Sequence, residues 1–235
     1  MLRAENLNKI YNTHHQALKN LNLEIKKGEI FCLLGANGAG KSTTVNIFMG
    51  FLEPTSGSVY VNDVLVRVKD NTTRQFVAYI PENVKLYPEL SGLENLDFFS
   101  SMSGKIYSKQ ELMSFLSRAG LQKEAFDKKV SGYSKGMRQK VGIALAIAKQ
   151  AKALFLDEPT SGLDPYAANE FSLILKELSK EGVSILMVTH DIFRAKEVAD
   201  RIGIMKNGVL QTVIPSEEIS HSELENTYLE IIKNN

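Results

Sequence analysis

The stretch Gly35-Ala36-Asn37-Gly38-Ala39-Gly40-Lys41-Ser42 points to one class of fold, because it matches the phosphate-binding pattern G-x-x-x-x-G-K-[ST]. The apolar run 30–34 before it predicts a strand buried on both faces, and residues 41–50 have a helical pattern. The glycines let successive N–H groups face an anion, and a helix N-terminus adds partial positive charge. We therefore expect a phosphate cradle, with Lys41 on the β and γ phosphates of a nucleoside triphosphate and Ser42 on Mg²⁺. A glycine turn that binds no ligand is the less favoured alternative.

The pair Asp157-Glu158 ends a second apolar run, residues 153–156. At the end of a strand, Asp157 would point at the Mg²⁺ shell, and Glu158 would stand at the tip, where a base can orient a water molecule. Acidic pairs also follow strands as plain surface caps. The cradle alone does not distinguish kinases, GTPases and motor ATPases. Because the acidic pair follows the cradle in the sequence at about the length of a domain, we interpret it as part of a catalytic site.

Hydrophobic periodicity divides the chain into α/β parts on either side of a helical stretch, residues 91–150. That stretch contains a capping box of Ser108 and Glu111, and we interpret it as a helical subdomain inserted into an α/β core. A helix should begin at Pro165 with Asp164 as its N-cap. A hairpin turn is expected at 206–208 and an amphipathic helix at about 216–232. Strands are expected at 21–25, 58–66 (as a pair or hairpin), 76–80, 153–157, 183–189 and 201–205.

Composition excludes several classes of protein. The 235 residues carry a formal net charge of +1, and the sequence pI is about 7.8, whereas nucleic-acid-binding domains usually have a pI above about 9. The only cysteine, Cys32, lies in an apolar run and should be a buried, inert thiol. No apolar signal segment opens the sequence, and the longest apolar run, 143–148, is far shorter than the roughly 18 residues of a membrane span. We expect no nucleic-acid partner and no membrane crossing by this chain alone.

Further motifs make the chain resemble the ATP-binding cassette (ABC) family from about residue 2 to residue 213. They are Tyr133-Ser134-Lys135-Gly136-Met137 at the start of a helix, Ser161-Gly162-Leu163-Asp164 after the acidic pair, and His190 after the strand 184–189. The resemblance implies a P-loop NTPase of ABC type, with a mixed RecA-like sheet, an N-terminal antiparallel β subdomain and an inserted helical subdomain. It implies a single domain over 1–235, in which 1–90 and 151–213 form the nucleotide-binding core, 91–150 the helical subdomain and 214–235 a C-terminal helix.

The resemblance also implies roles for single residues. Glu158 is expected to be the general base, His190 to hold the γ-phosphate and the attacking water, and Tyr11 to stack on adenine. Two chains are expected to sandwich two ATP molecules, so that Ser134 and Gly136 face the cradle of a second copy and Asp164 contacts it across the dimer. The expected metal ligands are Ser42, Asp157 and Glu82. The expected ATP-binding residues of the cradle are Gly35, Asn37, Gly38, Ala39, Gly40, Lys41, Ser42 and Thr43.

Two departures from the family pattern concern charge. Glu82 stands where the family usually has glutamine, and it adds negative charge beside Asp157, Glu158 and the phosphates. Lys135 replaces a glycine, and Met137 replaces a glutamine. We hypothesise that Lys135 offsets Glu82. Both departures resemble the branch of the family whose separate membrane partners are ABC-2-type permeases, which are mostly exporters.

The predicted function is therefore that of an ATP-hydrolysing subunit that powers transport through separate permease subunits. We expect it to act as a dimer of identical chains at the cytoplasmic face of the cell membrane. The loop 82–90 would meet the membrane partner, with Leu86 and Tyr87 in a docking groove, although a plain surface loop is the alternative. The rival classes are an ABC-type ATPase of DNA repair or chromosome structure, a translation ATPase, and a nucleotide-gated regulator without turnover. The first two are disfavoured because the sequence has no long heptad arm and a single cradle.

Overall fold

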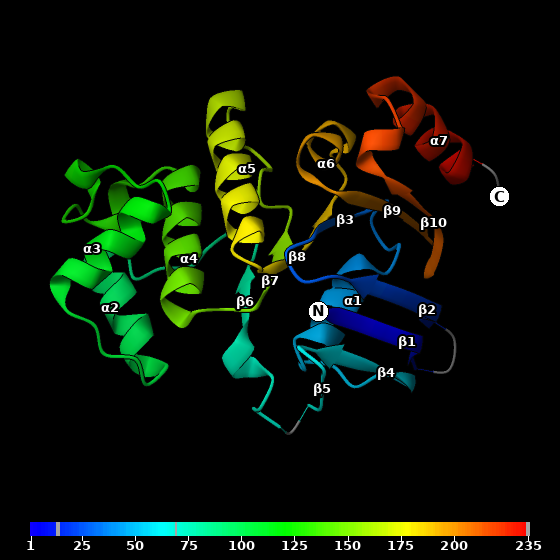
Figure 1. The fold of residues 1–235 in the computed structure, drawn as a ribbon, viewed down its shortest axis with the longest axis horizontal. Helices are drawn as coiled ribbons and strands as arrows, with labels where there is room; N and C mark the ends of the chain where they lie inside the picture. Colours follow the sequence, from blue (N-terminus) through cyan, green and yellow to red (C-terminus); the bar gives the residue numbers. More distant parts are fainter. Residues whose placement is uncertain (13–14, 69, 234–235) are drawn as a thin grey trace.

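Two β-sheets and a helical subdomain make up the computed structural model, which describes residues 1–12, 15–68 and 70–233 (Figure 1). The first sheet is antiparallel with the order β2-β1-β4-β5, and the second has the order β10-β9-β3-β8-β7-β6. In the second sheet β9, β3, β8, β7 and β6 run parallel, and β10 pairs antiparallel with β9. This is the mixed sheet with an antiparallel N-terminal part that the sequence resemblance implies.

The strands have these bounds: β1 Leu2–Tyr11, β2 His15–Ile25, β3 Ile30–Leu34, β4 Ser56–Val61, β5 Val64–Leu65, β6 Val77–Ile80, β7 Ala153–Asp157, β8 Ser184–Thr189, β9 Arg201–Lys206 and β10 Val209–Pro215. The helices are α1 Lys41–Phe48, α2 Gly92–Met102, α3 Lys109–Arg118, α4 Lys135–Lys149, α5 Pro165–Lys180, α6 Ile192–Val198 and α7 His221–Lys233. Short 3₁₀ turns are η1 Arg74–Phe76, η2 Lys123–Ala125, η3 Val130–Gly132 and η4 Ser216–Glu218.

The central strand β3 is buried on both faces, as the continuous apolar run predicts. Ile30, Cys32 and Leu34 pack into a core shared with the helices, whereas Phe31 and Leu33 pack into a second core between the two sheets and α1. The alternation follows from the period of two along a strand. Burial raises the pKa of the Cys32 thiol, so this cysteine has the inert character expected of it. The cradle therefore follows a strand that is fixed from both sides.

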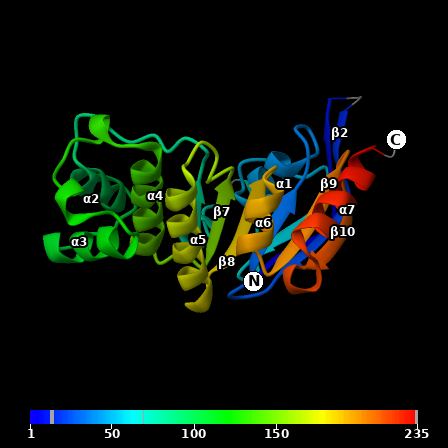
Figure 2. The ribbon, with the colours of Figure 1, turned by 90° about the horizontal axis from the view of Figure 1, so that it is seen from above.

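The helical subdomain forms one end of the molecule, with α2, α3 and α4 side by side in both ribbon views (Figures 1 and 2). Its helices begin at capping residues. Ser91 and Ser108 each form a full capping box, the second with Glu111 as predicted, and Ser134 caps α4 by accepting from Met137 N at 3.2 Å. These caps fix where α4 begins, and α4 connects the subdomain to the core through contacts with β6 and α5.

Several local predictions are confirmed, and two need correction. Asp164 caps α5 with Pro165 at the first turn, and Asn207 and Gly208 form the hairpin turn with positive φ angles of 50° and 81°. The strand expected at 21–25 is longer, because β2 already begins at His15. The tail helix begins at His221, and the expected start near 216 is instead the 3₁₀ turn η4.

Candidate nucleotide-binding site

The segments singled out in the sequence follow parallel strands and reach one edge of the second sheet. The cradle follows β3, Glu82 follows β6, Asp157 ends β7 and His190 follows β8. The carboxyl ends of neighbouring parallel strands lie at the same edge, which is where open α/β sheets bind ligands. The topology thus collects residues that are up to 155 positions apart in the sequence, from Gly35 to His190 (190 − 35).

The cradle is a tight turn with no room for a side chain at two of its glycines. Gly40 has a φ of 108°, and a Cβ atom there would lie 2.6 Å from the Ala17 carbonyl oxygen. At Gly35 a Cβ atom would lie 2.5 Å from the Met205 carbonyl oxygen. Contacts this short force a shift of backbone, so both positions require glycine for steric reasons.

Lys41 lies inside this turn with 7% of its surface exposed. Its Nζ donates to the carbonyl oxygens of Gly35 at 2.5 Å and Ala36 at 3.1 Å. Burial lowers the pKa of Lys41, and the carboxylates of Glu158 and Asp157 act in the opposite direction. The ammonium group is therefore held in the cradle and lies within the electrostatic reach of both acidic residues.

The outer part of the cradle is open to a ligand. Asn37, Gly38 and Ser42 are exposed, Ala39 and Gly40 are buried, and Thr43 is half-buried. The hydroxyls of Tyr11 and Thr43 lie 3.5 Å apart. Tyr11 is 36% exposed at the end of β1, so the structure brings the predicted adenine-stacking residue next to the cradle.

Asp157 is a half-buried carboxylate with little compensating charge. Burial, and after it the charge of Glu158, raises the pKa of Asp157, while the Tyr79 hydroxyl at 3.4 Å and the Lys41 ammonium oppose the shift. The same environment raises the pKa of Tyr79 to about 12. The sequence analysis did not single out Tyr79, which could be found only from the pairing of β6 with β7.

The donor set at this edge fits a magnesium ion. The Asp157 carboxylate and the Ser42 hydroxyl are oxygen donors, which Mg²⁺ prefers, and Lys41 is the one cation of the described residues that acts on this carboxylate. In the described ranges 1–12, 15–68 and 70–233, no group of three His, Cys, Asp or Glu side chains could hold a metal. Such an ion would thus depend on one or two carboxylates and the Ser42 hydroxyl, together with nucleotide phosphates, as Mg²⁺ sites of phosphoryl-transfer enzymes do.

Glu158 is held in a strained backbone conformation directly after β7. Its φ is +45°, which is uncommon for a residue with a side chain and costs about 1–3 kcal/mol. Its backbone N–H donates to the Val188 carbonyl oxygen at 2.9 Å, so β8 fixes the turn. The strain directs a single carboxylate to a defined place at the edge of the sheet, which is typical of functional sites.

Both oxygens of the Glu158 carboxylate accept hydrogen bonds from the end of β8. Thr189 Oγ1 donates to Oε2 at 2.9 Å, and His190 Nδ1 lies 2.8 Å from Oε1. Because an ionised carboxylate only accepts, Nδ1 is the donor, and each oxygen keeps a further lone pair for a water molecule. Glu158 is 16% exposed and His190 65% exposed, so the histidine lies on the solvent side of the pair.

Thr189 was missed in the sequence, although its position between the buried strand and His190 was the available signal. Its hydroxyl also accepts from the Asp191 backbone N–H at 3.0 Å. Thr189 thus fixes the Glu158 carboxylate and the start of the following turn at once, which makes it a positioning residue.

Glu82 forms an ion pair with Lys135 across the two parts of the protein. Lys135 Nζ lies 3.2 Å from Glu82 Oε1, and the same oxygen accepts from Ser161 Oγ at 3.1 Å. These hydrogen bonds, the one from Lys135 first, lower the pKa of Glu82. The two departures from the family pattern therefore meet in one chain, where Lys135 neutralises the extra carboxylate directly.

The buried Gln139 supports this contact from α4. Its side-chain amide donates to the carbonyl oxygens of Pro81 at 3.3 Å and Glu82 at 3.0 Å. Gln139 is fully buried, and the sequence analysis gave no role to it. Its position one turn after Lys135 on α4 is the signal that relates it to the loop at Glu82.

Ser134, Gly136 and Asp164 lie apart from the cradle of their own chain. Ser134 caps α4 and Asp164 caps α5, with Asp164 Oδ1 accepting from Ala167 N at 2.9 Å. Within the part of the chain that the structure describes, no hydrogen bond or ion pair joins these residues to the cradle. Ser134 and Asp164 thus act as helix caps in this chain, and their predicted contact with phosphate stays a prediction.

A family model gives the site its context, because residues 18–161, more than half of the chain, match the model described as ABC transporter. The chain belongs to the ABC transporter family. It is an ATP-binding cassette of that family, with the P-loop fold and the ATP-hydrolysing activity that define the group.

Curated relatives agree with the family match. The cassette is 39% identical over 200 residues to the uncharacterized ABC transporter ATP-binding protein YdbJ of Bacillus subtilis, a match that covers 85% of this chain and 64% of YdbJ. It is 34% identical over 210 residues to the linearmycin resistance ATP-binding protein LnrL of the same organism, which covers 88% of this chain and 67% of LnrL. The cassette thus spans about two thirds of the length of each of these two relatives.

Among solved structures, the cassette is similar to MJ0796, described as the dimeric structure of a post-hydrolysis state bound to ADP and Pi. The TM-score is 0.82 at 29% identity, and the match covers 92% of this chain and 99% of that one. The mixed sheet and the helical subdomain of the cassette are therefore those of a known ABC ATPase.

Proposed function

We propose that this cassette hydrolyses ATP with Glu158 as general base and powers export through separate permease subunits in the cell membrane. The observation that carries the proposal is the Glu158 carboxylate, which Thr189 and His190 hold at the same sheet edge as the cradle. A binding-only regulator would have no need for a strained, doubly anchored carboxylate at this place. That arrangement favours turnover over the rival of a nucleotide-gated regulator.

The chain's own residues divide the work as follows. The N–H groups of the cradle and the Lys41 ammonium bind the phosphates, and Tyr11 stacks on the adenine. Glu158 accepts a proton from a water molecule, and the exposed His190, held beside Glu158, contacts the γ-phosphate. Mg²⁺, held by Ser42, Asp157 and Glu82, would neutralise charge on the phosphate oxygens. These residues together place the attacking water in line with the γ-phosphate.

We propose that two identical chains form the complete sites. Ser134, Gly136 and Asp164 supply N–H groups and side chains at helix starts, which suit phosphate, yet each lies apart from its own cradle. A second copy placed head to tail would bring them to the partner's cradle. The printed description of MJ0796 as dimeric supports the same arrangement for a related cassette.

The permease partner is proposed to be of ABC-2 type, with the cassette at the cytoplasmic face of the membrane. The support lies in Glu82, Lys135 and Met137, which depart from the common pattern in the manner of that branch, and in the name of LnrL as a resistance protein. No helix in the described ranges is both long and apolar enough to span a bilayer. The groove beside Leu86 is the proposed contact with the permease.

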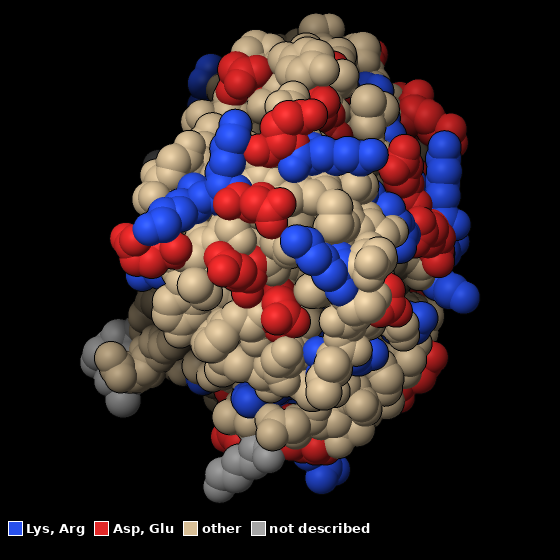
Figure 3. Space-filling view, turned by 90° about the vertical axis from the view of Figure 1, so that its left-hand side faces the viewer, with Lys and Arg blue, Asp and Glu red and all other residues tan. Residues whose placement is uncertain are grey.

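A nucleic-acid partner is not part of this proposal. On the face at the helical end of the molecule, Lys and Arg side chains alternate with Asp and Glu (Figure 3). A DNA- or RNA-binding face would instead gather positive charge in a patch or stripe. The mixed surface therefore matches the near-zero net charge of the sequence.

The test of the function is purification of the tagged cassette from its own membranes, followed by an ATPase assay with and without Mg²⁺. We expect Mg²⁺-dependent ATP hydrolysis and a multi-span permease in the purified complex. Binding of ATP without hydrolysis would support the regulator instead. A ribosomal or DNA-associated partner would contradict the transport proposal.

A double-mutant cycle tests the ion pair of Glu82 and Lys135. We expect Glu82→Gln and Lys135→Gly to change ATP turnover non-additively, because each single change leaves the other charge without its partner at 3.2 Å. The ATPase rates of both single variants and of the double variant measure the coupling. If the logarithms of the rates are strictly additive, the hypothesis that Glu82 and Lys135 are coupled is wrong. The exposed pair of Lys129 and Glu89, at 3.0 Å, provides a matched control cycle.

A further inference from the structure

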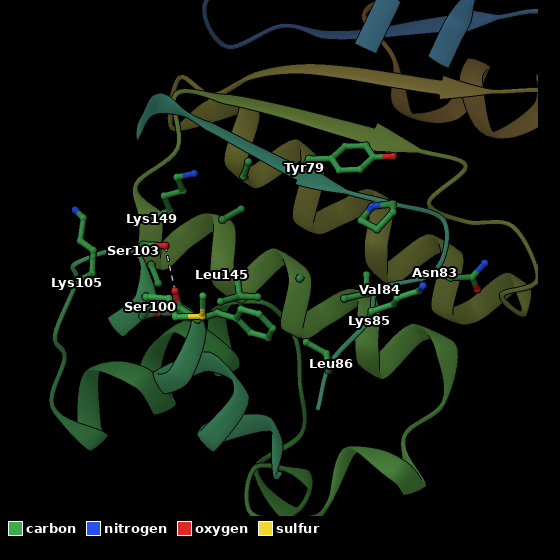
Figure 4. Close-up of a pocket in the computed structure, with 17 residues that line it drawn as sticks. Tyr79, Asn83, Val84, Lys85, Leu86, Ser100, Ser103, Lys105, Leu145 and Lys149 are labelled. Atoms are coloured by element: carbon green, nitrogen blue, oxygen red, sulfur yellow. Dashed lines mark hydrogen bonds between the residues drawn. The ribbon is translucent and has the colours of Figure 1, made fainter. Parts of the chain in front are cut away.

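A groove of about 630 Å³ lies between the C-terminal parts of α2 and α4 and the loop that follows β6 (Figure 4). Gly142, Leu145, Ala146 and Lys149 line it along α4. Their spacing of three and four residues puts them on one face of the helix, with Gly142 at one end and the lysine at the other. The groove thus has an apolar floor that ends in a positive charge.

The charges around this groove are all of one sign. Figure 4 shows Lys149 and Lys105 at one end and Lys85 at the other. Among the described residues, no Asp or Glu side chain lines the groove, and these three lysines have no ion pair. The groove therefore carries positive charge without negative charge to balance it, whereas both signs alternate on the surface at the helical end of the molecule.

Lys149 differs from the other two lysines because the protein withdraws it from water. It is half-buried, and burial alone lowers the pKa of its ammonium group, with no carboxylate opposing the shift. An unpaired cation in such a place is unfavourable, and it becomes favourable when an anion completes the pair. Among the described residues, none forms an ion pair or hydrogen bond with Lys149 that would stabilise its charge.

Hydrogen bonds and ring contacts hold the loop beside the groove in place. Asn95 is fully buried, and its side chain accepts from the Tyr87 backbone N–H at 2.8 Å and donates to the Tyr87 carbonyl oxygen at 3.0 Å. The Tyr87 ring packs against Phe98 and Phe99 with centroid distances of 4.9 and 5.8 Å. Phe99 also lines the groove. A preformed site of this kind loses little entropy when a partner segment enters.

We propose that Lys149 selects the docking segment by its charge, so that the segment is an amphipathic helix of the membrane partner with a carboxylate opposite Lys149. The inference rests on the proposed function, because it takes the occupant to be a cytosolic segment of a permease. Apolar side chains of that helix would cover Leu145 and the small residues of α4. Its Asp or Glu would pair with Lys149 at the end of the same face, where Lys105 adds a second cation.

The test starts from the full chain in its own cells, with a photo-crosslinking amino acid in place of Met102. Met102 lines the groove and is 71% exposed, so the probe reaches an occupant without disturbing the core. We expect it to crosslink to a cytosolic loop of a multi-span membrane protein that contains an Asp or Glu. Lys149→Glu should lower the yield at least tenfold.

Lys180→Glu is the matched control, because Lys180 is also the last residue of a helix and is exposed away from the groove. It should retain the wild-type yield. Lys149→Gln, which removes the charge without reversing it, should give an intermediate yield and a melting temperature no lower than that of the wild type. The ATPase rate of all three purified variants should equal that of the wild type, since none of these lysines touches the nucleotide site.

The deciding step reverses the charge on both sides. Exchange of the crosslinked loop's carboxylate for lysine should restore the yield of Lys149→Glu. A loop that crosslinks equally well with Lys149→Glu, or one without a carboxylate, would overturn the inference and leave the proposed transport function intact. If the probe crosslinks to no membrane protein, or only to a small apolar molecule, that result would contradict both the role of Lys149 and the proposed transport function.

Discussion

Replacement of Lys41 by alanine is expected to lower the rate of ATP hydrolysis by about 10²–10³, the usual effect of losing a preorganised electrostatic donor. The ammonium group is the cation inside the cradle, and its two hydrogen bonds to the turn hold it ready for the phosphates. No other cradle residue carries a positive charge, because the remaining positions of 35–43 are glycine, alanine, asparagine, serine and threonine. Steady-state ATPase assays at saturating ATP measure the loss.

The control must separate catalysis from folding, since Lys41 is buried and its bonds also support the turn. Lys176→Ala removes an exposed lysine of α5 and should leave the rate unchanged. A melting temperature of Lys41→Ala within a few degrees of the wild type shows that the fold survives. Turnover within tenfold of the wild type in a folded Lys41→Ala protein would exclude Lys41 as a phosphate ligand.

The part of the fold that the sequence predicts well is the part governed by one strong local signal. The continuous apolar run of β3, the caps of α3, α4 and α5 and the hairpin at Asn207 and Gly208 all appear where expected. Each depends on residues within a few positions of one another. Local chemistry is sufficient to fix such elements.

The strand β1 was not predicted because its alternation is interrupted. Register shifts occur between Ala4 and Leu7, and Asn6 between them has a φ of +47°. Buried positions therefore change from even to odd numbers along the strand, as β-bulges cause. The start of α7 had a usable signal that was overlooked, since Ser220 and Glu223 form reciprocal capping bonds just before the helix.

The candidate site shows a similar division. The cradle, the acidic pair and His190 can be found from motifs, because each is a short pattern at the end of an apolar run. The contacts that give them geometry join segments far apart in the chain, such as Thr189 with Glu158 and Gln139 with the loop at Glu82. The sequence analysis expected Lys135 to offset Glu82, but only the fold shows that the two side chains touch within one chain.

Glu158→Gln should almost abolish hydrolysis while ATP binding persists, so that the protein accumulates as a closed dimer in the presence of ATP. Glutamine keeps the shape of the side chain but cannot accept a proton from water, and loss of a general base typically costs about 10²–10⁴ in rate. The cradle and Lys41 are untouched, and in the proposed cycle it is hydrolysis that opens the closed dimer. Size-exclusion chromatography should show a dimer with ATP and a monomer with ADP.

The residues at the C-terminal end of β8 determine what the amide of Glu158→Gln can bind. Thr189 donates to one oxygen of Glu158 and His190 to the other, so an amide at this position must turn its NH₂ group toward one of the two donors and lose that hydrogen bond. Glu124→Gln, at an exposed glutamate of η2, is the matched control and should hydrolyse ATP at the wild-type rate without dimer accumulation. A Glu158→Gln protein that still turns over at the wild-type rate would therefore exclude Glu158 as the general base.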